Sequence, residues 1–124
     1  MEIGEYIAVD GSCPFEEWFN DLNAEAAAKV TTAITRMRQG NFSNVISVGG
    51  GVQERKIDFG PGYRVYLGRD GDRLIILLGG GTKKGQDNDI ADAIELWKEY
   101  KHRKKGETEK WHSQKTLKKL FRLV

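Results

Sequence analysis

A strand that alternates aromatic and basic side chains follows a Gly-Pro-Gly corner in this sequence. Successive side chains of a strand point to opposite faces, so Arg64 and Tyr66 share one face. On the preceding strand, Glu54 and Lys56 likewise share a face. If the two strands form the hairpin that the corner indicates, these four groups lie side by side on a sheet.

Two lysines, Lys83 and Lys84, follow the next strand and are expected to close the same surface from its end. A face with Lys, Arg and Tyr suits cleavage of RNA, because RNA carries its own nucleophile, the 2′-hydroxyl. The protein need only orient this group, accept its proton, stabilise charge on phosphorus and protonate the leaving oxygen. The base would be Glu54, or a Lys or Tyr with a lowered pKa. A tyrosine can alternatively stack on an unpaired base.

A plainer alternative is that these side chains form cross-strand ion pairs on a hydrated sheet face. No metal site is expected, because His102 and His112 are the only histidines and no Cys or carboxylate cluster joins them. The glycine-rich GGGTKKG does not match a phosphate loop, since Gly85 is followed by Gln86 and not by Lys-Ser/Thr. A dinucleotide site is not expected, for lack of a βαβ unit, and no cofactor is expected.

The composition is that of one polar globular domain. The chain has 124 residues, of which 39% are hydrophobic and 31% charged, enough for one core. A single cysteine, Cys13, excludes an internal disulfide and fits a reducing cytoplasm. The acidic, alternating N-terminus is unlike a signal peptide, and the longest apolar run, 74–78, is far too short to cross a membrane.

Charge is distributed unevenly along the chain. Residues 1–97 carry 10 Lys and Arg against 15 Asp and Glu, whereas residues 98–124 carry 10 against 3. A basic end of this kind is typical either of a polyanion partner or of a solvated tail.

The first half of the chain predicts a strand at 2–9 and two short helices joined as a hairpin. Ser12 is expected to cap the first helix, with Pro14 in its first turn. Asn23 is expected to cap the second helix, which Gly40 ends. Apolar residues at helical spacing form one stripe on each helix: Phe15, Trp18, Phe19 and Leu22, then Ala26, Val30, Ala33, Ile34 and Met37.

The second half predicts an antiparallel meander and a third helix. Strands are expected at about 52–59, 63–69 and 73–78, with a short one at 45–48. The strand at 73–78 is apolar on both faces, which indicates a central strand covered on both sides. Asp87 or Asn88 is expected to cap the third helix, whose apolar stripe is Ile90, Ala93, Ile94 and Trp97.

The tail differs in character from the rest of the chain. Helical spacing places four apolar residues among lysines: Leu117, Leu120, Phe121 and Val124. The pattern predicts a short basic amphipathic helix. The tail is expected to dock on the core through its apolar stripe, to bind RNA, or to be disordered if the helix does not form. The predicted fold is therefore α+β: an N-terminal strand and helical hairpin packed on an antiparallel β-meander, followed by a C-terminal helix. Its domain is expected to span 1–105, with the tail at 106–124.

The chain resembles the phage-derived addiction-module killer proteins (HigB-like) of the RelE/ParE toxin superfamily over roughly residues 1–103. Its most specific part is Gly-Pro-Gly-Tyr-Arg-Val-Tyr at 60–66; the other parts lie at 15–18, 51–57, 70–72, 74–84 and 89–90. The resemblance implies the same α+β toxin fold. It also implies a cognate antitoxin, often a helix-turn-helix DNA-binding protein, that neutralises the toxin in a hetero-oligomer.

Many members of this superfamily cut mRNA in the ribosomal decoding site without metal, so the resemblance implies a ribosome-dependent endoribonuclease. The ParE branch instead poisons DNA gyrase, and a relative that only binds RNA is a third alternative. Carried over by position, the catalytic candidates are Lys56, Arg64, Tyr66, Lys83 and Lys84. The RNA-binding candidates are Glu54, Tyr63, Arg69 and Arg73, with Glu54 also orienting Arg64.

Two positions depart from the family pattern. The position of Lys56 is usually Arg, and Arg55 stands where an apolar residue is usual. Arg55 is therefore expected to point into the buried side of the sheet, unless a bulge changes the register. No His or Tyr follows the last strand as a terminal acid or base.

Overall fold

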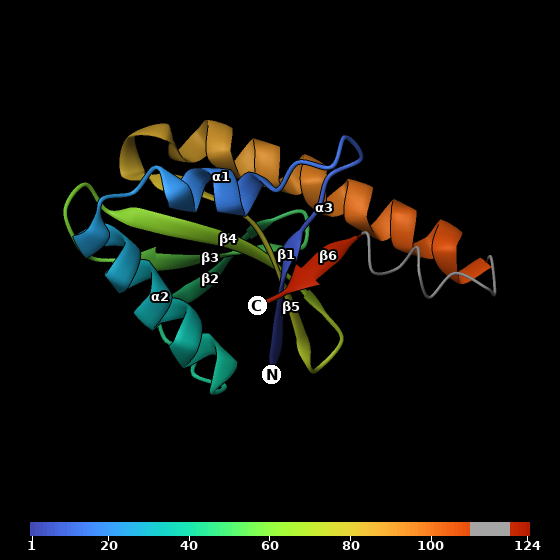
Figure 1. Ribbon diagram of the computed structural model, residues 1–124, viewed down its shortest axis with the longest axis horizontal. Coiled ribbons are helices and arrows are strands. Elements are labelled where there is room, and N and C mark those ends of the chain that lie inside the picture. Colours follow the sequence, from blue (N-terminus) through green and yellow to red (C-terminus); the bar gives the residue numbers. More distant parts are fainter. Residues whose placement is uncertain (110–119) are drawn as a thin grey trace.

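The computed structural model describes residues 1–109 and 120–124, with residues 107–109 described by their backbone alone. Its elements run along the chain as β1 (Glu2–Tyr6), α1 (Pro14–Asn20), α2 (Ala24–Arg38), β2 (Val45–Gly49), β3 (Val52–Ile57), β4 (Tyr63–Asp70), β5 (Leu74–Thr82), the 3-10 turn η1 (Lys83–Gly85), α3 (Gln86–Glu109) and β6 (Phe121–Leu123). Figure 1 shows a sheet with α2 on one side and α3 along the other.

The six strands form one sheet in the order β2-β3-β4-β5-β1-β6. The predicted meander is confirmed, because β2 to β5 pair antiparallel with their neighbours in sequence. The N-terminal strand β1 adds to the meander in parallel with β5, and β6 pairs antiparallel with β1. The α+β class predicted from the sequence is thus confirmed.

The sheet carries a hydrophobic core on each face. Ile75 and Leu77 of β5 point to the face covered by α1 and α2, where they pack with Phe15, Val30 and Met37. Ile76 and Leu78 point to the opposite face and pack under α3 with Ala93, Trp97 and Tyr100. The strand that is apolar on both faces in sequence is therefore covered on both faces, as predicted.

The predicted caps of the helical hairpin are only partly correct. Asn23 caps α2, and its side chain accepts a hydrogen bond from the backbone N–H of Ala26 at 2.8 Å. The residue at the N-cap of α1 is Cys13 and not Ser12. Ser12 instead donates its hydroxyl and its backbone N–H to Asp10, in the loop before the helix.

Helix α3 begins at Gln86, earlier than the predicted caps, because η1 leads directly into it. It then runs to Glu109, so the boundary predicted between residues 105 and 106 falls inside this helix. Within the described residues, no helix is both long enough and apolar enough to span a membrane.

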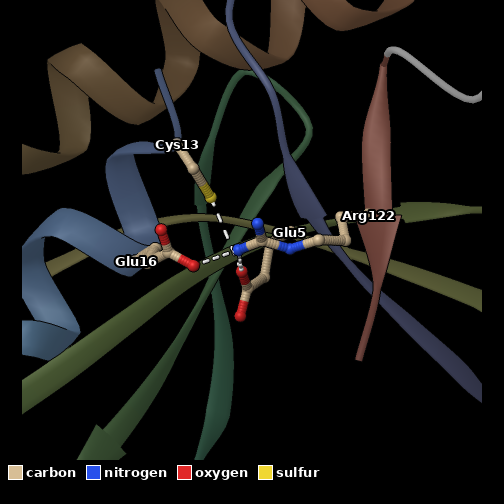
Figure 2. Close-up of polar contacts among 4 residues, drawn as sticks. All are labelled: Glu5, Cys13, Glu16 and Arg122. Atoms are coloured by element: carbon tan, nitrogen blue, oxygen red, sulfur yellow. Dashed lines mark hydrogen bonds and ion pairs between the residues drawn. The ribbon is translucent and has the colours of Figure 1, made fainter. Parts of the chain in front are cut away.

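The end of the chain corrects the predicted tail helix. Phe121 and Arg122 lie in β6, an edge strand, while Leu117 falls outside the described residues. Figure 2 shows how β6 is held: the Arg122 guanidinium donates to Glu5 of β1 at 2.8 Å and also to Glu16 of α1. The Cys13 thiol donates to the same Glu5 carboxylate at 3.6 Å. The helical spacing of apolar residues predicted the wrong structure here, because the segment pairs with the edge of β1, which would otherwise be unpaired.

Candidate functional site

The β3–β4 ladder brings together the four side chains that the sequence placed on one face. Glu54 lies opposite Tyr66, and Lys56 lies opposite Arg64. Directly opposed residues of an antiparallel pair share a face of the sheet. The pairing inferred from the Gly-Pro-Gly corner is therefore correct.

Glu54 and Arg64 form a buried ion pair at this place. The Arg64 Nε atom lies 3.3 Å from Glu54 Oε1, and the two residues are 5% and 1% exposed. Gln86, the first residue of α3, donates its side-chain amide to the same Glu54 oxygen at 2.8 Å. Glu54 thus orients Arg64, and α3 closes over both of them.

This geometry corrects one expectation, since the polar face of the meander is not an open, hydrated surface at these residues. Tyr66 is 1% exposed and belongs to the core under α3, beside Ile76 and Leu78. The alternative of cross-strand ion pairs on a hydrated face is only half correct: Glu54 of β3 and Arg64 of β4 do form a cross-strand ion pair, but the pair is buried.

The environment of Tyr66 fixes its protonation state. Burial, together with the nearby carboxylates of Glu54 and Asp89, raises the pKa of the Tyr66 hydroxyl far above its usual range. In this closed arrangement the shift is opposite in direction to the lowered pKa that a tyrosine base would need. At neutral pH the buried Tyr66 hydroxyl therefore keeps its proton and is available as a hydrogen-bond donor.

Three exposed lysines lie in the elements that adjoin the buried pair. Lys56 lies opposite Arg64, and Lys83 and Lys84 form η1. The carbonyl oxygen of Gly62 accepts two hydrogen bonds, one from the Arg64 guanidinium and one from the backbone N–H of Lys83, each with a nitrogen–oxygen distance of 3.0 Å. A cavity of 430 Å³ adjoins Lys83 and Lys84 at the start of α3. We call Lys56, Arg64, Lys83 and Lys84 the cationic end of the sheet.

The other RNA-binding candidates lie elsewhere. Tyr63 is on the opposite face, where its ring stacks on Phe59 at 6.5 Å. The Arg69 guanidinium lies over the Phe42 ring at 4.2 Å, near the far end of β4. Arg73 is exposed, in the turn before β5. None of these three residues belongs to the cationic end.

Arg55 points into the buried side of the sheet, which is one of the two outcomes expected from its unusual position. It is 5% exposed and lies opposite Val65, with no shift of register between β3 and β4. Burial, with a smaller contribution from Arg36, lowers the pKa of its guanidinium. Its NH1 group donates to the backbone carbonyl of Lys56.

Gln86 and Asp89 belong to the site and were not identified from the sequence. Asp89 borders a 120 Å³ cavity between α1 and α3, together with Tyr66 and Trp18. Burial and the neighbouring Asp92 raise the pKa of the Asp89 carboxyl. One signal was present: Gln86 precedes Ile90 and Ala93 by four and seven residues, so it extends the buried stripe of α3.

Comparison with known proteins gives a relative but no activity. No family model matches the chain. The chain is similar to an uncharacterized protein of Haemophilus influenzae, with 43% identity over 88 residues, which are 70% of this chain and 89% of the relative. Such identity over most of both proteins shows common descent, and the chain belongs to the same protein family as this Haemophilus influenzae protein.

Proposed function

We propose that this protein is the toxin of a type II toxin–antitoxin system and acts as a metal-independent, ribosome-dependent mRNA endonuclease. The observation that carries the proposal is the cationic end of the sheet. The Arg64 guanidinium and the backbone N–H of Lys83 both donate to the Gly62 carbonyl, Lys56 lies opposite Arg64 on the neighbouring strand, and Lys84 follows Lys83 in η1. The resemblance to addiction-module killer proteins supplies the toxin class and the antitoxin partner.

In this proposal the RNA supplies the nucleophile. The 2′-oxygen attacks the adjacent phosphorus, a cyclic phosphate forms, and the bond to the 5′-oxygen of the next nucleotide breaks. The lysines of the cationic end stabilise the added negative charge on the phosphate oxygens. The proton of the 2′-hydroxyl goes to Glu54 or to one lysine in its neutral form, while the other lysines keep their charge, and the Tyr66 hydroxyl donates to the leaving oxygen.

The buried members of the site require a movement before they contact RNA. Gln86 holds Glu54, and Glu54 holds Arg64, so the first turn of α3 covers both. Displacement of this turn on the ribosome exposes the Arg64 guanidinium and the Tyr66 hydroxyl. Lys56, Lys83 and Lys84 are exposed without any movement and make the first contacts with the phosphate backbone.

The test uses exposed residues, because loss of Arg64 would leave Glu54 buried without its partner and destabilise the fold by about 3–5 kcal/mol. We expect Lys56→Ala with Lys84→Ala to lower cleavage of mRNA in a translating extract by about 100-fold, since each removes a charge that stabilises the transition state. Cut sites are mapped by primer extension. Lys29→Ala with Lys98→Ala, which removes two exposed lysines outside the cationic end, is the matched control.

A double variant that cuts mRNA as fast as the parent protein would exclude the cationic end as the active site. An unchanged circular dichroism spectrum and melting temperature must accompany any loss of cleavage. Only then is the loss one of function and not of folding.

A second function is favoured by the burial of Glu54, Arg64 and Tyr66, which withdraws the central groups from solvent. In that case the protein is a toxin without nuclease activity that inhibits a protein target such as DNA gyrase. Accumulation of cleaved gyrase–DNA complexes, without cuts in mRNA, would identify this function. RNA binding without either effect would identify a relative that has lost the chemistry.

A further inference from the structure

A second basic site lies at the other end of the α3-covered face, away from the cationic end. It is a cleft of 340 Å³ between the end of β4 and the C-terminal half of α3. The residues that matter here are Asp70, Trp97, Tyr100, Lys101, Lys104 and Lys105. We call it the α3 cleft.

The floor of the α3 cleft is aromatic and fixed in place. The rings of Trp97 and Tyr100 stack with centroids 5.0 Å apart and planes 8° apart. Trp97 is pressed against the sheet so closely that a Cβ atom on Gly68 would lie 2.4 Å from its ring. Trp97 is 5% exposed, so the surface it offers is its outer edge, extended by the apolar stems of the lysines.

The rim of the cleft is cationic. Lys101 holds its ammonium group 5.9 Å from the Trp97 ring centroid, and Lys105 follows one turn later. The only carboxylate that borders the cleft, among the described residues, is Asp70, which accepts hydrogen bonds from Tyr100 and Lys104, both at 2.5 Å. The negative charge of Asp70 is thus neutralised within the cleft.

The charges of α3 are sorted between its two sides. The side away from the cleft borders another cavity, which carries the acidic residues Asp92, Glu95 and Glu99 beside Lys98 and His102. Lys98 forms an ion pair with Glu95, in which Nζ and Oε1 are 3.3 Å apart. The basic side of the helix therefore coincides with the aromatic floor. The positive charge of α3 is concentrated at the α3 cleft and is not spread evenly over the helix surface.

We propose that the α3 cleft binds a nucleotide unit of an RNA strand, with its phosphate between Lys101 and Lys105 and its base against the aromatic floor. Positively charged grooves with aromatic side chains are the usual means of holding single-stranded nucleic acid. An acidic peptide would satisfy the lysines but has no flat apolar group for the floor. A volume of 340 Å³ lies at the lower end of the range for small-ligand pockets and suits one nucleotide.

The α3 cleft lies close enough to the cationic end for one RNA strand to contact both sites. Lys56 pairs with Arg64 at one end of the β3–β4 ladder, and Val52 pairs with Gly68, under Trp97, at the other. Four residues along a strand span about 13 Å, a distance that a strand of a few nucleotides covers. The inference goes beyond the proposed function, because binding in the cleft requires no cleavage.

The test is fluorescence anisotropy of a labelled, unstructured 12-nucleotide RNA with the full-length protein at several salt concentrations. We expect Lys101→Ala with Lys105→Ala to weaken binding about tenfold at low salt. It should reduce the slope of log K against log salt by about 0.7, since the one phosphate held between the two lysines contributes about 0.7 on a single strand. Lys29→Ala with Lys98→Ala removes the same charge outside the cleft and should leave both quantities nearly unchanged.

Equal weakening by both double variants would overturn the proposal in favour of non-specific attraction, and so would unchanged binding by the cleft variant. Competition by a decameric Glu peptide as effective as unlabelled RNA would assign the cleft to an acidic protein instead. An abasic strand that binds the parent protein as tightly as the normal strand would also exclude the aromatic floor as a contact. None of these readouts depends on toxicity or mRNA cleavage, so failure here is separable from failure of the proposed function.

Discussion

The buried pair of Glu54 and Arg64 is the most constrained feature at the level of single residues. A buried ion pair contributes little net stability, because removing both charges from water costs about as much as their attraction returns. What the pair provides is position: the guanidinium is held between Glu54 and the Gly62 carbonyl at the cationic end. Once the first turn of α3 is displaced, an arginine fixed in this way needs little further reorganisation when negative charge develops nearby.

Asp70 is a partly buried residue whose ionisation is expected to affect stability in acid. Although burial opposes it, hydrogen bonds from Lys104 and Tyr100 lower the pKa of this carboxyl. A pKa lower in the folded than in the unfolded state stabilises the fold above the unfolded value of about 3.9. This stabilisation is lost as the pH falls through the folded pKa.

We therefore expect Asp70→Asn to reduce the free energy of unfolding by about 1–3 kcal/mol at pH 7, since hydrogen bonds to a charged group are lost. The difference from the parent protein should shrink below about pH 4, where the parent carboxyl is also being protonated. Melting temperatures measured between pH 3 and pH 7 check this. Asp72→Asn, in the exposed turn beside it, is the control, and a constant difference across that range would contradict the argument.

At the level of elements, the end of the chain is held mainly by burial. Leu120 is 1% exposed and packs with Tyr6 and Tyr100 under α3. The ion pairs of Arg122 with Glu5 and Glu16 are partly exposed, and such pairs are worth less than about 1 kcal/mol. Strand β6 therefore stays paired with the edge of β1 mainly because Leu120, directly before β6, is buried in the core.

This comparison predicts different effects for two leucines three residues apart. Leu120→Ala should lower the free energy of unfolding by about 2–4 kcal/mol, because it leaves a cavity in a packed core. Leu123→Ala, at a side chain that is 56% exposed, should change it by no more than about 0.5 kcal/mol. Urea denaturation measures both changes. Similar losses for the two variants would show that β6 is held by its pairing with β1.

How far the sequence predicts these elements depends on how local their causes are. The stripes of α1 and α2, the cap at Asn23 and the β3–β4 hairpin depend on neighbours in sequence, and they were predicted. The strand at Phe121 depends on the distant edge of β1, so its helical spacing gave a wrong prediction. Alternation likewise placed Arg64 and Tyr66 on one face, but only the docking of α3 decided that this face is covered.

At the level of the whole molecule, two helical layers share one sheet. Residues of β4 and β5 contribute alternately to both cores: Val65 and Leu77 to the core under α1 and α2, Tyr66 and Ile76 to the core under α3. Loss of either layer would expose one face of the same central strands. The two layers should therefore unfold together, even though their helices lie on opposite sides of the sheet (Figure 1).

Two tryptophans allow this cooperativity to be measured, since Trp18 lies in the α1 layer and Trp97 under α3. With Trp111 replaced by Phe in both, Trp97→Phe leaves Trp18 as the single reporter and Trp18→Phe leaves Trp97. In each variant the urea midpoint from tryptophan fluorescence should equal the midpoint from far-ultraviolet circular dichroism of that same variant, because shared strands couple the layers. An earlier fluorescence transition for Trp97 alone would show that α3 separates from the sheet as an independent unit. Such separation of the whole helix goes beyond what the proposed contact between Arg64 and RNA requires, because that contact needs only a local displacement of the first turn of α3, which is compatible with cooperative global unfolding.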